Sequence, residues 1–279
     1  MEFLTFELIT LFIILCMLAG TAGFLAGLLG IGGGLVLVPG LYFTFSSLGY
    51  ESDHLMHVAV GTSLGTIMAT GLSSARSHHK RGAVDFNLIR QIGPGLILGV
   101  ILGSLVASIV DSFWLKCFFV PALFALATLM LVSPKNTAVQ ESLPPKLITG
   151  AITSIIGLIS SLMGIGGAAL NVPFMTLCRV PVHKAIGSAS AMGILVAITG
   201  TIGFFIIGLG DVNSNLPPFT IGFINILALA IIMPITILIA PLGVAVAHKV
   251  SVTRLKKIFS IFLFFLGFRM AAEIYPALF

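Results

Sequence analysis

The chain is divided into ten apolar segments by short polar loops, and this division constrains the fold more than any other feature. The segments lie at about residues 4–29, 33–48, 55–79, 88–110, 113–132, 146–163, 168–178, 184–209, 219–247 and 252–272. A helix of about 20 apolar residues crosses the hydrocarbon core of a membrane. Hydrophobic residues make up 58% of the chain and charged residues only 8%, too few to cover a soluble surface. We therefore predict an all-α membrane protein.

A glycine-rich motif occurs once in each half of the chain. Leu-Gly-Ile-Gly-Gly-Gly ends at Gly34 and returns, 134 residues later, as Met-Gly-Ile-Gly-Gly-Ala ending at Ala168. A Val-Pro pair follows each copy at the same distance, and glycine and proline both resist continuous helix. In lipid, the freed backbone groups must find partners in the protein or in a wet cavity. The motif thus predicts two helix breaks near the membrane midplane, at a binding site.

The two copies belong to a predicted duplication. Residues 1–132 form the first transmembrane repeat, 133–145 a polar cytoplasmic linker, and 146–279 the second transmembrane repeat. His57-Val-Ala-Val-Gly61 in the first half also matches His183-Lys-Ala-Ile-Gly187 in the second. Each repeat would hold four to five transmembrane segments. The segments after the glycine motifs are short and could be half-helices or re-entrant arms, so eight and ten crossings both stay open.

The distribution of basic residues predicts the orientation. Short cytoplasmic loops are enriched in Lys and Arg. If the chain crosses the membrane in alternating directions, twelve of the fourteen basic residues can lie on one side of it. They are Arg76, Lys80, Arg81, Arg90, Lys135, Lys146, Arg179, Lys184, Lys249, Arg254, Lys256 and Lys257. The loops at 49–54 and 210–218 contain acidic residues and no Lys or Arg. We therefore expect both termini outside, and two repeats of inverted topology.

The first apolar run is expected to be retained as a membrane segment. The residues before it carry Glu2 and Glu7, and they lack the basic region with which a secretory signal begins.

At these motifs the sequence resembles the sulfite exporter TauE/SafE family of membrane transporters. The matching stretches are Gly30–Gly34 with Val38-Pro39, Ala59–Ser63, His78–Asp85, and Gly164–Gly167 with Val172-Pro173. The resemblance covers essentially the whole chain. It implies movement of sulfite, thiosulfate or small organosulfonates across the bacterial cytoplasmic (inner) membrane. The second copy departs from the first at Ala168 and Ala189, which stand in place of Gly34 and Ser63.

The candidate substrate-binding residues lie at the two breaks and on the segments that follow them. A helix that restarts at a glycine presents free N–H groups and the positive end of its dipole. These groups can bind an anion, so the site needs no buried Lys or Arg. The candidates are Gly32, Gly33, Gly34, Thr62, Ser63, Gly166, Gly167, Asn171, Ser188 and Ser190. Two other interpretations stay open. The glycines could serve only close helix packing, and the hydroxyls could bond carbonyls of their own helices.

Three further residues are candidates for coupling or gating. His57 and His183 are equivalent in the two repeats, and an ordinary histidine pKa near ~6.5 suits a coupled proton, although an interfacial histidine is often only solvated. Arg76 lies one turn before Lys80, where it either attracts anions at the cytoplasmic mouth or extends to the interface.

The sequence predicts no cofactor and no catalytic or metal centre. The three cysteines are scattered without Cys-x-x-Cys spacing, and no phosphate-binding loop occurs. We therefore predict a secondary transporter for a small anion, with the lipid bilayer, and a proton or cation, as its other partners and with no nucleic acid. An anion channel of the same architecture is the alternative, and a membrane-embedded enzyme is disfavoured.

Overall fold

The computed structural model describes residues 2–29, 32–50, 52–132, 143–210, 215–247 and 252–275. In these residues the chain forms ten α-helices and one short β-hairpin, so the predicted all-α class is confirmed. Gly30 and Ile31 of the first glycine motif, most of the predicted linker and Asp211 lie outside the described residues. The same holds for Lys249 and for the side chains of Arg254 and Lys256.

The helices follow the apolar segments closely. Their bounds are α1 Glu2–Leu29, α2 Gly34–Ser47, α3 Leu55–His79, α4 Phe86–Ala107, α5 Ser112–Val132, α6 Lys146–Leu162, α7 Ala168–Leu177, α8 Val182–Leu209, α9 Ile226–Ala247 and α10 Val252–Ile274. Six of them are long and apolar enough to span a membrane, namely α1, α3, α4, α5, α8 and α9. The helices α2, α6 and α7 are shorter, as expected for the arms beside a helix break.

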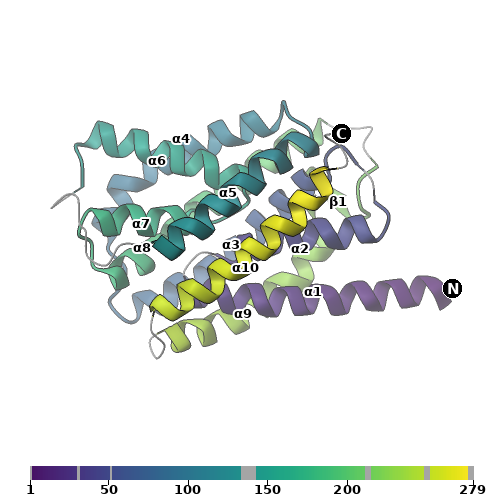
Figure 1. Ribbon diagram of the computed structural model, residues 1–279, viewed down its shortest axis with the longest axis horizontal. Coiled ribbons are helices and arrows are strands. Elements are labelled where there is room, and N and C mark those ends of the chain that lie inside the picture. The colour runs from purple at the N-terminus through teal and green to yellow at the C-terminus, as the bar shows by residue number, and fades with distance from the viewer. Residues whose placement is uncertain are drawn as a thin grey trace.

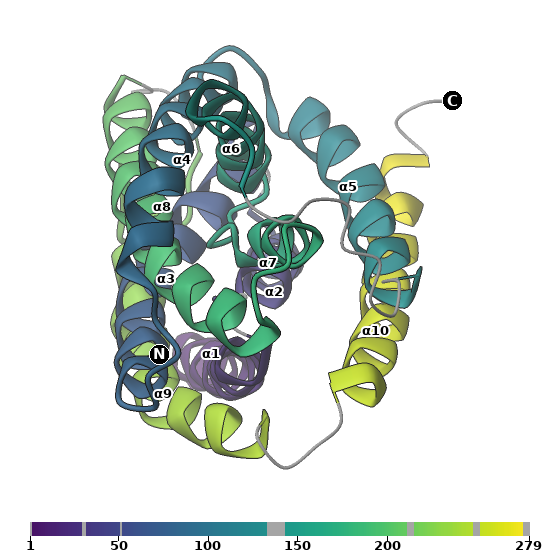
Figure 2. The same ribbon diagram turned by 90° about the vertical axis from the view of Figure 1, so that its left-hand side faces the viewer.

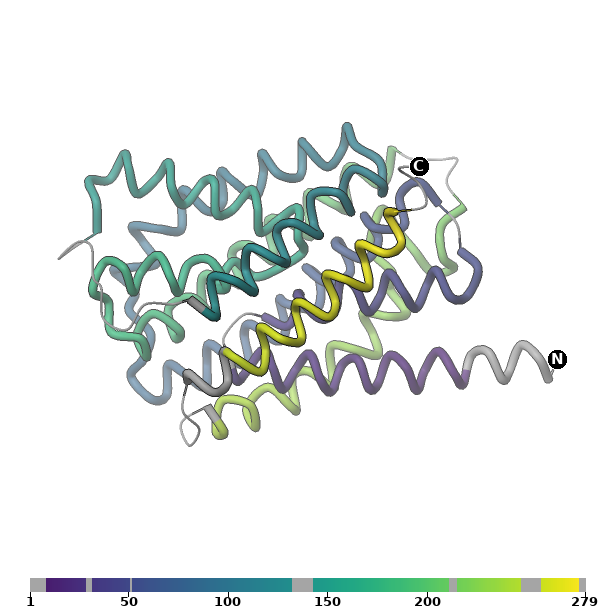
Figure 3. Tube along the Cα trace, viewed as in Figure 1, coloured from purple at the N-terminus to yellow at the C-terminus, as the bar shows by residue number. Residues whose placement is uncertain are grey.

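The helices form an elongated bundle in which two hairpins point toward each other. Figure 1 shows α1 and α2 entering from the end that holds the start of α1, and α6 and α7 entering from the opposite end. The Cα trace in Figure 3 shows that the coloured part of α1 runs into the bundle from the end at which α10 finishes. The two glycine turns thereby come to lie in the interior, far from both ends.

Helix α3 lies at the centre of the bundle and packs against α8 and α9. In its most apolar window of 18 residues, 83% of the residues are buried, against 28–44% in the other five candidate spans, so α3 is the most buried of the six. Helix α1 packs along α9 and α4 packs along α6. Figure 2 shows α5 and α10 as a separate pair at one side, joined by the rings of Phe124, Phe264 and Phe268.

One predicted segment differs from the structure. The apolar run at 219–247 was expected to be helical throughout, but it begins with a β-hairpin of β1 (Thr220–Ile221) and β2 (Ile224–Asn225). Phe219 and Gly222 adopt left-handed backbone conformations there, with φ of 63° and 59°. The Asn225 side chain then accepts the N–H of Ala228 at 2.9 Å and caps the helix. A local turn and an N-cap therefore override the continuous apolar pattern.

Candidate functional site at the two helix breaks

The first helix break lies between α1 and α2. Gly33 precedes α2 with φ 78° and ψ −8°, a left-handed conformation that glycine adopts without steric cost. The first hydrogen bonds of α2 run from Val36 N and Leu37 N to the Gly33 carbonyl, both at 3.0 Å. The N–H groups of Gly34 and Leu35 lie ahead of these bonds, where a helix has no internal acceptor to offer them.

The second break repeats this geometry. Gly167 precedes α7 with φ 73° and ψ −13°. Leu170 N and Asn171 N donate to the Gly167 carbonyl at 3.2 and 2.9 Å. The N–H groups of the first two residues of α7 are again ahead of the helical hydrogen bonds. The predicted breaks are therefore present in both halves, with the same handedness.

The backbones of the two breaks touch. The Ser63 hydroxyl, on α3, donates to the Gly164 carbonyl of the second break at 2.8 Å. A Cβ atom on Gly34 would overlap that same carbonyl and would lie 3.0 Å from the Ile165 Cα atom. A Cβ atom on Gly32 would lie 3.6 Å from the backbone nitrogen of Gly166. Close backbone approach thus requires glycine at position 34, whereas Gly32 has a φ of 76°, a left-handed conformation that favours glycine.

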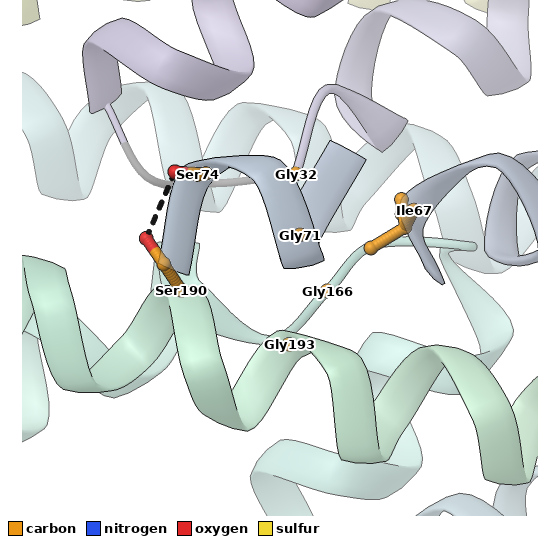
Figure 4. A pocket seen from close by; sticks show the side chains of 7 residues that line it. All are labelled: Gly32, Ile67, Gly71, Ser74, Gly166, Ser190 and Gly193. Carbon is orange, nitrogen blue, oxygen red and sulfur yellow. Dashed lines mark hydrogen bonds between the residues drawn. The ribbon is translucent and has the colours of Figure 1, made fainter. Parts of the chain in front are cut away.

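A small enclosed space remains between the breaks, with a volume of about 10 Å³. Figure 4 shows it between the two glycine turns, α3 and α8. Its lining residues are Gly32, Ile67, Gly71, Ser74, Gly166, Ser190 and Gly193. That volume is about the minimum for one water molecule, so a sulfite ion needs the two breaks to separate. The site is closed in this conformation.

Asn171 is the most informative polar side chain near the breaks. It is fully buried, at 0% exposure, and neither its Nδ2 nor its Oδ1 atom has a hydrogen-bond partner among the described residues. Its Nδ2 atom lies 3.1 Å from where a Cβ atom of Gly167 would be, which places the amide beside the second break. An unsatisfied buried amide costs free energy, and the binding of a substrate by Asn171 stays a prediction.

Some site residues were missed by the sequence analysis. Ser160 of α6 is fully buried and lies 3.3 Å from the same Cβ position at Gly167, while it donates to the Ile156 carbonyl. Gly71, Ser74 and Gly193 line the space between the breaks. All four residues lie outside the glycine motifs, and the packing of α3, α6 and α8 brings them to the site.

The four predicted hydroxyls fall into two groups. Ser190 lines the space between the breaks and donates to the Ile186 carbonyl at 3.0 Å, and Ser63 holds the second break as described. Thr62 and Ser188 instead contact connecting segments. The Thr62 hydroxyl accepts the Asn225 N–H at 2.8 Å, and the Ser188 hydroxyl accepts the Asp85 N–H at 2.9 Å. Their assignment to the substrate stays a prediction.

The two equivalent histidines have different environments. His57 is fully buried, its Nε2 atom lies 2.9 Å from the Ala107 carbonyl oxygen, and its ring centroid is 5.0 Å from that of His54. The interpretation of His57 as a solvated interfacial histidine is therefore wrong, whereas His183 is exposed at the start of α8. Arg76 is also exposed, in the last turn of α3. The coupling and gating roles of these three residues stay predictions.

Comparisons with known proteins agree on one family. The model of the family described as "Sulfite exporter TauE/SafE" matches residues 14–270. A probable membrane transporter protein of Haemophilus influenzae is 37% identical over 262 residues, which cover 93% of this chain and 98% of that protein. The probable membrane transporter protein MJ0441 of Methanocaldococcus jannaschii is 30% identical, over 96% and 98% of the two chains. YunE of Bacillus subtilis, a probable membrane transporter protein, is 32% identical over 71% and 79%. No solved structure matches the chain.

Proposed function

Because the chain belongs to the sulfite exporter TauE/SafE family of membrane transporters, we propose that it is a secondary transporter for small sulfur-containing oxyanions. Its relatives are membrane transporters and not enzymes. The proposed cargo is sulfite, thiosulfate or an organosulfonate, and the proposed location is the bacterial cytoplasmic membrane. The meeting of two helix breaks beside an unsatisfied buried amide is the observation that carries this proposal.

The anion would be held without a permanent cation. The first N–H groups of α2 and α7 provide donors and positive dipole ends, and the Nδ2 atom of Asn171 adds one more donor. Neutral donors pay a smaller desolvation cost in the membrane than a buried Lys or Arg does. They also release the anion more easily. Such a site can therefore bind the anion on one side of the membrane and release it on the other.

The packing supports an inverted repeat. Helix α1 packs along α9 as its counterpart α6 packs along α4. A Cβ atom on Gly61 would overlap the Phe223 carbonyl, and one on Gly187, its counterpart, would overlap the Ala83 carbonyl. The paired hydroxyls of Thr62 and Ser188 likewise accept backbone N–H groups just ahead of α9 and α4. This matched set of contacts is what a duplicated unit inserted in opposite directions would make.

Alternating access follows from this arrangement. The two hairpins enter from opposite ends and touch through backbone atoms at the glycine turns (Figure 1). Movement of either hairpin away from the other would widen the closed space toward one end only. The connections that carry Arg81 and Arg179, and the start of α8 with Lys184, lie at one end of the bundle, which we assign to the cytoplasm, with both termini outside.

Flux into liposomes tests this function. Purified protein should catalyse saturable uptake of sulfite, thiosulfate, taurine or sulfoacetate, and preloading with unlabelled substrate should accelerate uptake by counterflow. Sulfate serves as the comparison oxyanion, and each flux is measured with and without a pH gradient to detect proton coupling. Saturable uptake without counterflow would indicate a channel of the same architecture. Absence of flux for all the sulfur anions would contradict the proposal.

A further inference from the structure

The closed space between the breaks has two chemically different walls. On the side toward the start of α3, Ile67 closes it: the Ile67 Cγ2 atom lies 3.1 and 3.2 Å from where Cβ atoms of Gly32 and Gly166 would be. On the side toward the end of α3, Ser74 and Ser190 close it, and Figure 4 shows their side chains meeting between α3 and α8. Ser74 follows Ile67 by seven residues, which corresponds to about 10 Å along a helix. One wall is therefore apolar and the other polar.

The polar wall faces the end of the bundle that carries the basic loops. Helix α3 runs from Ser74 to its end just before Arg81, and Ser190 lies close after the start of α8. In the other direction the contact between α3 and α8 is apolar. Leu64 is fully buried there, and its Cδ1 atom lies 2.8 Å from where a Cβ atom of Gly200 would be. An anion that leaves the breaks past the two serines thus moves toward the basic end.

The contact between the two serines is long for a hydrogen bond. Ser74 donates to the Ser190 hydroxyl with an oxygen–oxygen distance of 3.4 Å, whereas such bonds usually measure about 2.5–3.0 Å. Ser190 in turn donates to the Ile186 carbonyl at 3.0 Å. Both serines are buried. Because a hydroxyl rotates about its C–O bond, each serine can turn its donor toward an anion.

The backbones of α3 and α8 do not touch at this contact. A Cβ atom on Gly71 would lie 3.7 Å from the Ser190 carbonyl oxygen, which is an ordinary van der Waals distance. It would lie 3.3 Å from the Ile194 Cγ1 atom, which belongs to a side chain. In this stretch the two helices therefore meet through side chains, which can rearrange.

A second pair of buried serines has a different setting. The hydroxyl oxygens of Ser104 on α4 and Ser161 on α6 are also 3.4 Å apart. Here the two backbones are in direct contact, since a Cβ atom on Gly99 would overlap the Ser154 carbonyl. Helices α4 and α6 are thus expected to stay together, and this pair provides a matched control for the first.

We propose that the contact between Ser74 and Ser190 is the gate through which the transported anion passes between the breaks and the basic end of the bundle, an inference that rests on the proposed transport function. The gate opens when α3 and α8 separate at this contact. The two hydroxyls then donate to the anion in place of their present acceptors. Ile67 keeps the opposite side closed at that stage, as alternating access requires.

Labelling of single cysteines tests the gate without a transport measurement. The full-length protein, with its three native cysteines replaced by alanine, carries Ser74→Cys, Ser190→Cys or Ser161→Cys. The charged reagent 2-sulfonatoethyl methanethiosulfonate is added to one face of sealed membrane vesicles. Arg81→Cys, in the exposed loop after α3, identifies the face of the basic end. Ser74→Cys and Ser190→Cys should react from that face at least tenfold faster than from the other, and Ser161→Cys should react from neither.

A disulfide across the gate tests its role in transport. Oxidation of the double variant Ser74→Cys with Ser190→Cys should lower uptake of taurine and sulfoacetate at least tenfold, and reduction should restore it. These two sulfonates replace sulfite because sulfite cleaves disulfides. The control is Ser104→Cys with Ser161→Cys, in which oxidation should leave uptake unchanged. Counting free thiols verifies that both disulfides have formed.

Several results would overturn the proposal. In the labelling experiment, these are faster reaction of the two gate cysteines from the opposite face, no reaction from either face, or equal reaction of Ser161→Cys. In the transport experiment, they are uptake that persists after the gate disulfide has formed, or equal loss in the oxidised control. If the reduced gate variant and the wild type carry neither sulfonate, the proposed function fails for organosulfonates, and the labelling result alone decides whether the gate opens.

Discussion

Gly34→Ala is expected to lower sulfite flux at least tenfold and to destabilise the protein. Gly34 lies within helical backbone, so alanine suits its conformation, but the added methyl group overlaps the Gly164 carbonyl and lies 3.0 Å from the Ile165 Cα atom. Backbone atoms cannot rotate away, so the two breaks must move apart or α2 must shift. Overpacking of this kind costs about 1–3 kcal/mol. Flux in liposomes and the Tm in detergent measure the two effects.

Gly150→Ala is the matched control for this change. Gly150 lies in α6, and nothing stands within 4 Å of a Cβ atom added there. Alanine should be neutral or stabilising at that position, by up to about 1 kcal/mol from helix propensity. Wild-type flux in Gly34→Ala would show that close contact between the breaks is not needed for transport. Equal loss in both variants would assign the effect to folding or expression in general, not to the contact.

Asn171→Leu is expected to raise the KM for sulfite at least tenfold while the Tm stays equal or increases. The amide of Asn171 is buried and unpartnered, which costs about 1–3 kcal/mol in the unliganded protein. Leucine has the same number of side-chain heavy atoms in the same branched arrangement, removes that cost, and already occupies the corresponding position of the first repeat as buried Leu37. Loss of function with retained stability is the signature of a group kept for its ligand. Concentration-dependent flux and thermal unfolding measure the two quantities.

Asn225→Leu provides the contrast. The Asn225 amide is also buried, but it donates to the Pro218 carbonyl and to the Thr220 hydroxyl at 2.9 and 3.0 Å. It also accepts the Ala228 N–H at 2.9 Å. Its replacement should lower the Tm through the lost cap and leave the KM of the remaining folded protein near the wild-type value. If Asn171→Leu lowers the Tm in the same way and leaves the KM unchanged, Asn171 is a structural residue.

The positions of the helices and of both breaks were predictable because each depends on local properties. Apolar runs of the required length mark the spans, and the glycines mark the breaks, because Gly33 and Gly167 adopt the left-handed conformation just ahead of α2 and α7. The Val-Pro pairs do not interrupt the chain as predicted, since Pro39 and Pro173 lie inside these two helices. The hairpin at 220–225 was not predictable from hydropathy. Ile221, Phe223 and Ile224 continue the apolar run of the helix that follows, and the turn depends on φ at Phe219 and Gly222 together with the cap from Asn225.

The composition of the site was predictable only in part. Comparison of the two repeats identified Asn171 as a candidate, because a polar group there replaces Leu37 of the first copy. The same comparison did not identify Ser160 or Gly193, whose proximity to the breaks depends on how α6 and α8 cross the other helices. The burial of His57 was missed for the same reason. Its position at a segment end indicated solvent, but the turn containing Phe223 packs against it with ring centroids 5.1 Å apart.

The central claim is that the transported anion binds between the two breaks, and locating a bound anion tests it most directly. Selenite replaces sulfite, and crystals of the full-length protein grown with selenite are measured at the selenium absorption edge. We predict an anomalous selenium peak between the Gly32 and Gly166 turns, within hydrogen-bond reach of Asn171 and the first N–H groups of α7. A peak confined to the ends of the bundle, or to the lipid-facing surface, with the space between the breaks still closed, would contradict the account.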